Sequence, residues 1–313
     1  MRALVFDETL QFAERPYKAL PGECLVRVIL AGICNTDLEI TAGYMGFTGV
    51  LGHEFIGVVV QGPDELLDKR VVGEINVACG ECVLCRQGLE RHCATRTVLG
   101  IAGRDGAMAD ALSLPAKNLH LVPETVTDVE ATFVEPLAAA CEILEQVHID
   151  PSARICLIGD GKLAILIGRV LACIGAAVTV VGKHPEKMVK IPAIERIEAH
   201  RFKPDRSFDI VIEASGHPSG WQTALQAVRP RGTVVLKSTY AGGFEFNPAP
   251  LVIDEITVVG SRCGRFAPAL RLLADGKVRV EDLVSAIYPF DQALEAFAAA
   301  RSSQTIKVLV GVS

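Results

Sequence analysis

Four cysteines in one short stretch constrain this chain more than any other feature of it. They are Cys79, Cys82, Cys85 and Cys93, in the segment Cys-Gly-Glu-Cys-Val-Leu-Cys-Arg-Gln-Gly-Leu-Glu-Arg-His-Cys. Two CxxC steps and one longer return let a single loop wrap four thiolates around one tetrahedral ion, and zinc is the ion that such a set favours. Because four protein ligands leave no position open for a substrate, the sequence predicts a structural zinc here. Any chemistry is expected elsewhere in the chain.

The size and charge of the chain limit its class. It has 313 residues, which is more than one hydrophobic core usually serves, so two domains are expected. A net charge of -6 argues against nucleic acid or an anionic membrane as a partner. The N-terminal sequence turns acidic at Asp7, too early for a secretory signal, and no apolar run is long enough to span a bilayer. With ten cysteines and these features, a reducing cytoplasm is the expected location.

The pattern of apolar residues changes after Glu135. Before it, a strand over 24–30 and shorter ones over 58–60 and 71–72, separated by Gly, Pro and Asp, indicate an antiparallel β-rich domain. After it, apolar strands alternate with helices, which indicates a doubly wound α/β domain with a parallel sheet covered on both faces. The expected strands are 154–158, 178–181, 208–212, 232–236 and 256–259, and the expected helices are 136–146 and 163–174. A helix over 268–275 and a strand over 306–310 follow, so residues 1–137 and 268–313 are predicted to form one domain and 138–267 the other.

A glycine-rich turn follows the first strand of the α/β region. It reads Gly159-Asp-Gly161-Lys162-Leu163-Ala and leads into a helix. This is the GxGxxA form of the turn in which glycines allow a pyrophosphate to approach the backbone, and the helix N-terminus favours the anion. The sequence therefore predicts a dinucleotide site.

The end of the second strand of this region indicates which dinucleotide is bound. NAD sites usually place Asp or Glu there, to bind the 2′-hydroxyl of the ribose. This chain has Gly182 at that position, followed by Lys183, His184 and Lys187, and no carboxylate at the tip itself. Gly182 leaves room for a 2′-phosphate, Lys183 and Lys187 can neutralise it, and His184 can donate to it. The sequence therefore favours NADP over NAD, although a solvated basic turn would look the same.

Three further segments carry residues that suit a catalytic metal. Cys34 offers a thiolate, His53 an imidazole and Glu135 a carboxylate. Three mixed protein ligands with a fourth position open are typical of catalytic zinc. Each residue also has an ordinary structural explanation, and their spacing alone does not prove that they converge.

Taken together, these motifs resemble the zinc-containing medium-chain dehydrogenase/reductase superfamily over nearly all of the chain. The resemblance rests on Gly-Ile-Cys34-Asn-Thr36-Asp37, Gly52-His53-Glu54, the Cys79 to Cys93 lobe, Glu135-Pro-Leu, the Rossmann turn, Glu213-Ala-Ser-Gly216 and the terminal Lys307-Val-Leu. The Glu135-Pro-Leu form is more similar to the sorbitol, glucose and threonine dehydrogenases than to the alcohol dehydrogenases that use a second cysteine there. The resemblance implies a GroES-like domain beside the Rossmann domain, and two zinc ions per chain.

The resemblance also implies roles for single residues. Cys34, His53 and Glu135 would hold the catalytic zinc, with Glu54 beside it as a further ligand or water-binding group, and Asp37 would orient the His53 ring. Thr36 would bind the substrate oxygen and pass its proton outward. Residues flanking the nicotinamide and its ribose would be Ala214, Ser215, Gly216, Lys237, Ser238, Thr239, Ser261, Arg262 and Cys263.

Two departures from the superfamily pattern concern the substrate side. The family often has a histidine five residues after the cysteine ligand, where this chain has Glu39, so either Glu39 has a raised pKa or the proton relay ends in water. The loop over 43–50 is compact, and Tyr44, Met45 and Phe47 are expected to shape one wall of the substrate pocket, or only to pack the loop.

The predicted function is zinc-dependent hydride transfer between NADP(H) and a secondary alcohol, polyol or sugar, or the matching ketone or aldehyde. The alternatives are a zinc-independent enone or quinone reductase of the same superfamily and a non-catalytic NADP(H)-binding regulator. The substrate is a small molecule, and edge strands of the parallel sheet are expected to join in a homodimer or homotetramer.

Overall fold

The structure is a computed structural model that describes residues 1–239 and 246–312. The chain divides into two compact units, Met1–Glu135 with Phe266–Ser313 (unit 1) and Pro136–Arg265 (unit 2). These limits lie within two residues of the predicted domain boundaries. In the described residues, no helix has the length and apolarity needed to cross a membrane.

Unit 1 is built on a largely antiparallel sheet. Strands follow the order β11-β6-β5-β3-β19-β18, and β10 also pairs with β3. The bounds are β3 Cys24–Gly32, β5 Glu54–Gln61, β6 Arg70–Gly73, β10 Ala111–Leu114, β11 Leu119–Leu121, β18 Val284–Pro289 and β19 Lys307–Gly311. Strand β3 is buried along most of its length because it lies between β5 and β19, and its pairing with β19 brings the two ends of the sequence into one sheet.

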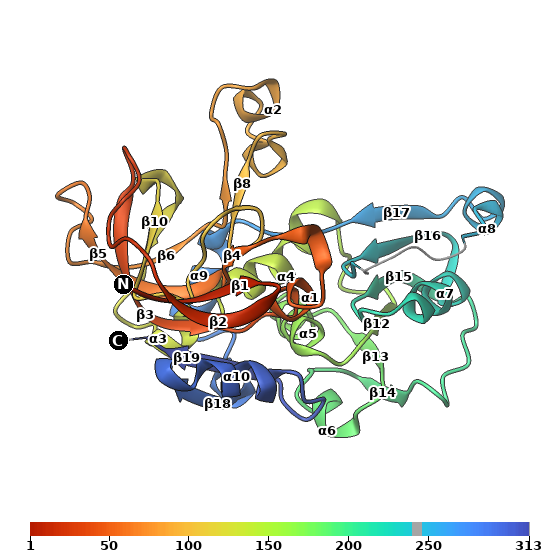
Figure 1. Ribbon diagram of the computed structural model, residues 1–313. Coiled ribbons are helices and arrows are strands. Elements are labelled where there is room, and N and C mark those ends of the chain that lie inside the picture. Colours follow the sequence, from red (N-terminus) through yellow and green to blue (C-terminus); the bar gives the residue numbers. More distant parts are fainter. Residues whose placement is uncertain (240–245, 313) are drawn as a thin grey trace. The chain divides into compact units, whose positions relative to one another are not determined.

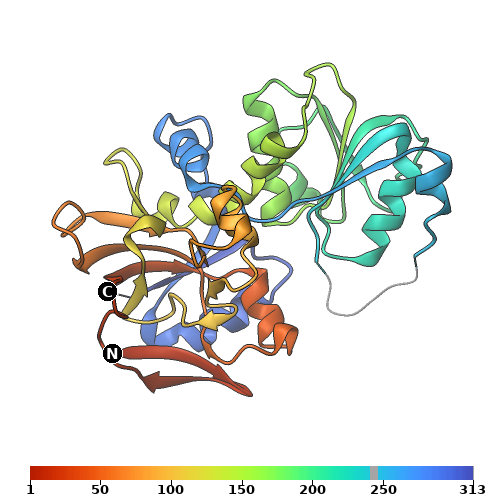
Figure 2. The same cartoon turned by 90° about the horizontal axis from the view of Figure 1, so that it is seen from above.

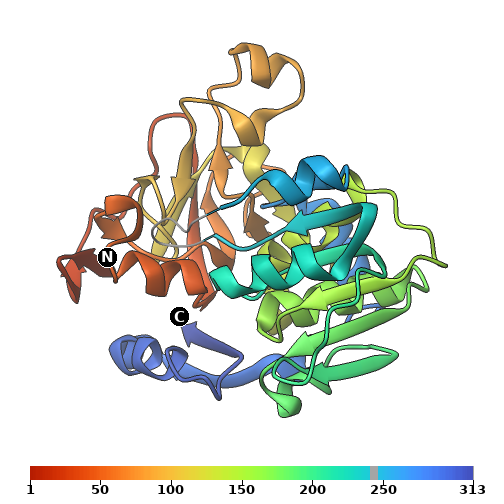
Figure 3. The same ribbon diagram turned by 90° about the vertical axis from the view of Figure 1, so that its right-hand side faces the viewer.

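Shorter elements surround this sheet. A second sheet holds β1 Arg2–Asp7, β2 Thr9–Glu14 and β4 Gly49–Val50, and a third holds β7 Asn76–Val77, β8 Thr97–Leu99 and β9 Gly103–Arg104. The segment between β7 and β8, with α2 Val83–Arg86 and η2 Glu90–His92, extends away from the main sheet of unit 1 (Figures 1 and 3). The remaining helical elements are α1 Asn35–Ile40, η1 Tyr44–Gly46, η3 Ala116–Asn118, α3 Asp128–Ala131, α9 Phe266–Ala274, η4 Glu281–Leu283, η5 Phe290–Gln292 and α10 Ala293–Ala300.

Unit 2 contains one parallel sheet, with the order β14-β13-β12-β15-β16-β17 in the described residues. Its strands are β12 Ile155–Ile158, β13 Val178–Gly182, β14 Glu195–Glu198, β15 Phe208–Glu213, β16 Val228–Leu236 and β17 Thr257–Gly260. The order 3-2-1-4-5-6 is that of the Rossmann fold, so this part of the predicted fold class is confirmed. Strand β14 was not predicted, because Glu-Arg-Ile-Glu at a sheet edge lacks the apolar run that marks the other strands.

Helices cover both faces of the parallel sheet. They are α4 Val134–Gln146, which begins at the end of unit 1, α5 Lys162–Cys173, α6 Pro185–Met188, α7 Pro218–Ala227 and α8 Ala249–Ile253. Helix α5 lies on one face and α7 on the other (Figure 2), as right-handed crossovers in opposite directions from β12 require. All strands of the sheet run the same way, so the loops that follow them meet at one edge.

Candidate metal and dinucleotide sites

The four cysteines of the extended segment lie together in unit 1. Their sulfur atoms are all within 4.8 Å of one another, with separations of 3.4 Å for Cys82–Cys85, 3.5 Å for Cys79–Cys93 and 3.9 Å for Cys79–Cys85. A tetrahedral zinc with bonds of about 2.3 Å would set its sulfurs about 3.8 Å apart, so the spacing fits such an ion.

The thiols of this group differ in acidity. A hydrogen bond with Thr95 lowers the pKa of Cys93 to about 6, whereas burial raises the pKa of Cys85 to about 12. Four thiolates at this separation repel one another unless a cation lies among them. The donor set therefore suits a bound metal better than four free thiols.

A second group of ligand atoms lies at the start of β5 and α1. Cys34 is the residue before α1, and His53 and Glu54 lie where the chain enters β5. One ligand atom from each of these three residues lies within 4.8 Å of the others. His53 and Glu54 are buried, and in the described residues Oε1 of Glu54 has no hydrogen-bond partner. Buried polar atoms without partners are costly, so these residues fit a metal ion.

The buried carboxylate of Asp37 positions this group of residues through hydrogen bonds to the backbone and a contact with the ring of His53. Its Oδ2 accepts a hydrogen bond from the amide of Cys34 at 2.8 Å, and its Oδ1 accepts one from the amide of Gly52 at 3.1 Å. The same Oδ1 lies 3.4 Å from Nδ1 of His53, which leaves Nε2 as the ring atom available to a metal. Burial alone would lower the pKa of His53, but the charges of Asp37 and Cys34 outweigh it and hold that pKa well above its ordinary value.

Glu54 pairs with a lysine that we did not assign to the site from the sequence. The Lys307 ammonium, on the first residue of β19, contacts Oε2 of Glu54, and both side chains are fully buried. It also lies 5.5 Å from the ring centre of Phe133. Burial lowers the pKa of Lys307 to about 8, and the charges of Cys34 and Asp37 oppose that shift. A lysine opening a final apolar strand was the sequence signal for this pair.

The ion pair of Glu54 and Lys307 leaves space only for glycine at position 32. A Cβ atom at this position would lie 2.6 Å from Oε2 of Glu54 and 3.1 Å from Nζ of Lys307. No other residue fits without displacing one of the two charges.

The other residues predicted to take part in catalysis are not members of this group of three ligand atoms. Glu135 is half-buried in the first turn of α4 and does not belong to the group of three ligand atoms. Thr36 places its hydroxyl 3.8 Å from the sulfur of Cys34, within reach of an oxygen bound near that sulfur. Glu39 lies on the exposed side of α1. The roles of Glu135, Thr36 and Glu39 stay predictions.

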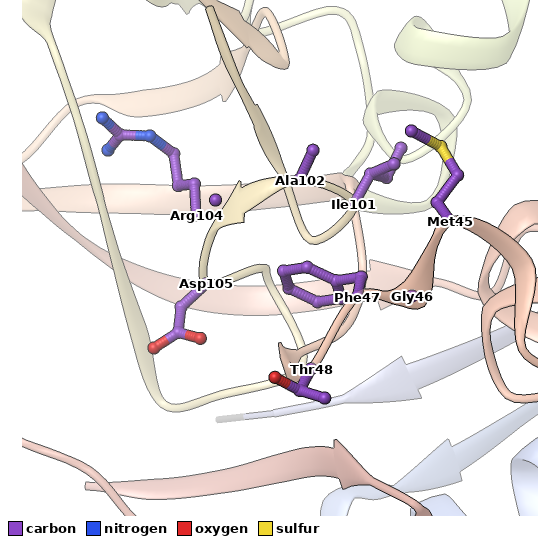
Figure 4. Close-up of a pocket in the computed structure, with 9 residues that line it drawn as sticks. Met45, Gly46, Phe47, Thr48, Ile101, Ala102, Arg104 and Asp105 are labelled. Atoms are coloured by element: carbon purple, nitrogen blue, oxygen red, sulfur yellow. The ribbon is translucent and has the colours of Figure 1, made fainter.

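A cavity of about 550 Å³ lies in unit 1, between η1 with its following loop and the turn over 101–105 (Figure 4). Met45 and Phe47 line it on one side, and Ile101, Arg104 and Asp105 on the other. The residues that line it do not include Tyr44, Cys34 or His53. The predicted substrate wall therefore borders a real cavity, but one whose lining excludes the metal-binding residues.

The residues predicted to bind the dinucleotide lie at the carboxyl edge of the parallel sheet in unit 2. Gly159 and Gly161 form the turn between β12 and α5, with Lys162 and Leu163 in the first turn of that helix. The other predicted residues follow strand ends: Gly182, Lys183, His184 and Lys187 at β13, Ala214, Ser215 and Gly216 at β15, Lys237, Ser238 and Thr239 at β16, and Ser261, Arg262 and Cys263 at β17. This is the edge at which Rossmann sheets bind their ligands.

Five of these residues make contacts with one another or with α4 within unit 2. The ammonium of Lys237 donates to the carbonyl oxygens of Ala139 and Arg262 and to the hydroxyl of Ser261, at 2.7, 2.9 and 3.1 Å. Lys237 and Ser261 therefore tie the ends of β16 and β17 to α4. The hydroxyl of Ser238 accepts a hydrogen bond from the amide of Gly216 at 2.8 Å, which joins two neighbouring strand ends.

The tip of β13 differs from the sequence interpretation. We expected no carboxylate there, but the carboxylate of Asp160 reaches this tip from the glycine-rich turn and accepts hydrogen bonds from the amides of Lys183 and His184. The expectation was wrong because it considered only residues that follow the strand. An aspartate between the two glycines was the signal that it missed.

Comparisons with known proteins agree with this division. Residues 20–124 match the alcohol dehydrogenase GroES-like domain, and residues 163–275 match the zinc-binding dehydrogenase domain. D-arabinitol dehydrogenase 1 from Uromyces fabae is 28% identical, over 92% of this chain and 89% of the relative. A short chain alcohol dehydrogenase (rspB) from E. coli CFT073, solved with NADH, has a TM-score of 0.90 and 25% identity, covering 100% of this chain and 99% of that chain.

A further solved structure, from Sinorhizobium meliloti 1021 with bound NADP, has a TM-score of 0.90 at 24% identity, covering 99% of each chain, and shows the fold alone. The matched domains define a two-domain zinc-binding dehydrogenase fold. The chain belongs to the zinc-containing medium-chain dehydrogenase/reductase superfamily, and the predicted family and fold class are confirmed.

Proposed function

We propose that this chain is a zinc-dependent oxidoreductase that transfers hydride between a nicotinamide dinucleotide and a secondary alcohol, polyol or sugar. The observation that carries the proposal is the group of Cys34, His53 and Glu54, a thiolate, an imidazole and a carboxylate whose ligand atoms lie within 4.8 Å of one another, with Oε1 of the buried Glu54 unpartnered in the described residues. This donor set has the mixed character of catalytic zinc sites, with Glu135 as the further predicted ligand. The similarity to D-arabinitol dehydrogenase 1 supports a polyol among the substrates.

The protein residues contribute position and proton transfer. A zinc ion held by Cys34, His53 and Glu54 supplies Lewis acidity toward an alcohol or carbonyl oxygen. Thr36, whose hydroxyl lies 3.8 Å from the sulfur of Cys34, would hydrogen-bond that oxygen and pass its proton toward solvent. Asp37 fixes the imidazole of His53, and Lys307 fixes the carboxylate of Glu54, so that the ligands keep their orientation.

The form of the coenzyme is the finer part of the proposal. The sequence favours NADP, and the exposed side chain of Lys183 supports it. The neighbour from E. coli was solved with NADH, and Asp160 introduces a carboxylate at the deciding position. Relatives alone do not separate the two coenzymes.

The edge of the parallel sheet supports an oligomer. In the described residues β17 pairs with β16 alone, and Val258 of β17 is exposed, as are Val252 and Ile253 of α8, the helix that precedes β17. A second copy pairing along β17 would cover this edge and these side chains. Light scattering coupled to size exclusion should give a dimer or tetramer, and a monomer at micromolar concentration would contradict it.

The test of the proposed function is zinc content together with turnover. Elemental analysis of protein prepared without added metal should give two zinc ions per chain, and one for Cys34→Ala. The variant should lose oxidation of alcohols and polyols, followed by reduced-coenzyme absorbance, yet keep coenzyme binding. Cys173→Ala, an exposed cysteine in unit 2, is the matched control and should retain both. One zinc per wild-type chain would refute the zinc mechanism and favour the zinc-independent reductase or the regulator.

A further inference from the structure

The carboxylate of Asp160 is almost enclosed at the tip of β13. Asp160 is 9% exposed and lies between Gly159 and Gly161. Its Oδ2 accepts hydrogen bonds from the amides of Lys183 at 2.5 Å and His184 at 2.6 Å. Nδ1 of His184 lies 3.1 Å from Oδ1. Because the carboxylate is held by three donors on one turn, its charge has a fixed position.

Gly182 makes room for this carboxylate. A Cβ atom at this position would lie 2.7 Å from Oδ2 and 2.8 Å from Cβ of Asp160. The end of the second strand is where NAD-binding sheets usually carry the acidic side chain that binds the ribose. Here that place holds no side chain of its own, and Asp160 supplies a carboxylate to it from the neighbouring turn.

The same contacts remove donors that a 2′-phosphate would use. Consecutive backbone amides after a strand form an anion-binding concavity, and the amides of Lys183 and His184 are already bound to Asp160. One ring nitrogen of His184 is likewise turned toward Asp160. The side chain of Lys183 is exposed and that of Lys187 is largely buried. A phosphate at the tip would thus approach a fixed negative charge, with one exposed lysine on the turn to offset it.

We infer that Asp160 determines coenzyme selectivity, excluding a 2′-phosphate and accepting a ribose hydroxyl, so that the chain prefers NAD(H) to NADP(H). The inference rests on the dinucleotide site of the proposed function and revises the NADP preference drawn from the sequence. Oδ1 receives one contact from the imidazole and keeps capacity for a hydroxyl donor. Gly182, which suggested room for a phosphate, is instead the space that Asp160 requires.

The experiment measures the binding of two coenzyme fragments by calorimetry, a readout that requires neither turnover nor a catalytic metal ion. The probes are 5′-AMP and adenosine 2′,5′-bisphosphate, which differ only in the 2′-phosphate. Wild-type protein should bind 5′-AMP about tenfold more tightly than the bisphosphate, and Asp160→Asn should shift that ratio about tenfold toward the bisphosphate. Raising the salt from about 20 mM to about 300 mM should narrow the wild-type difference, because it screens the repulsion.

The matched control is Glu186→Gln, which removes an exposed carboxylate from the same turn. It should leave the ratio unchanged, and an equal shift in this variant would overturn the role of Asp160. Tighter wild-type binding of the bisphosphate would overturn the inference directly, even if Asp160→Asn failed to fold. If wild-type protein bound neither fragment, the dinucleotide site of the proposed function would itself be wrong.

Discussion

The buried pair of Lys307 and Glu54 gives the sharpest quantitative prediction. Both side chains are fully buried, so in protein with no metal beside Glu54, Lys307→Met leaves this carboxylate without a cation in a site that water does not reach. Breaking a buried ion pair in this way costs about 3–5 kcal/mol. Methionine keeps a flexible apolar stem of similar length. The cost should therefore come from the stranded charge.

The effect should be local to unit 1 and can be measured there. Hydrogen exchange of peptides from β3, β5 and β19 should accelerate about 10²- to 10³-fold in the variant, if exchange follows the free energy of opening. Trp221 is the single tryptophan of the chain and lies in α7 of unit 2, so its fluorescence transition in urea is an internal control and should not move. Lys277→Met, at an exposed lysine, should change neither signal.

A double substitution separates charge from packing. Adding Glu54→Gln to Lys307→Met removes the unpaired charge and should restore most of the lost protection. If the double variant exchanged as fast as Lys307→Met, the cost would lie in the packing of the lysine stem, and the argument from charge would be refuted.

Three further predictions follow from contacts in unit 1. Cys93→Ser should lose one zinc per chain by elemental analysis, and unchanged zinc would exclude the four-cysteine site. Burial raises the pKa of Glu74, but hydrogen bonds led by His120 outweigh this and hold it below the ordinary value, so the carboxylate stabilises the fold above about pH 4.5 and loses that effect as the pH falls through its lower folded value. Glu74→Gln should thus cost about 1 kcal/mol in urea unfolding at pH 7 and progressively less as the pH falls below about 4.5, and a cost independent of pH would contradict this. Gly32→Ala should cost about 1–3 kcal/mol because its methyl group meets the buried ion pair, whereas Gly260→Ala meets open space and should cost little; equal costs would refute the steric argument.

The parts of the fold that the sequence predicted are those with a local signal. The strands β12, β13 and β15 are apolar runs buried in the middle of a parallel sheet, and such runs need few partners to be recognised. The four-cysteine group was predictable for the same reason, because its ligands lie close together in sequence. Strand β14 has no such run, because it lies at the edge of the sheet and three of its four residues are charged.

The contacts that the sequence did not predict join residues from different strands and turns, which only the folded backbone brings together. Lys307 and Glu54 are separated by 253 positions, and they meet because β3 pairs with β19 on one side and with β5 on the other. The carboxylate of Asp160 reaches the tip of β13 from the turn after β12. A pattern of residue types does not show in which direction a turn residue points its side chain. Lys307, Glu54 and Asp160 are charged residues that the tertiary structure buries, and local sequence preference has little influence on where such residues lie.

The position of β19 also determines when unit 1 can be completed during synthesis. Unit 2 is one uninterrupted segment and can fold as soon as it leaves the ribosome, whereas β3 waits for a partner strand made after all of unit 2. Until then β3 lacks its β19 neighbour and the Glu54 carboxylate stays in water. The nascent chain therefore passes through a stage in which unit 2 is complete but the main sheet of unit 1 still lacks β19, and chaperones or a second nascent copy would meet an unpaired strand edge at that stage.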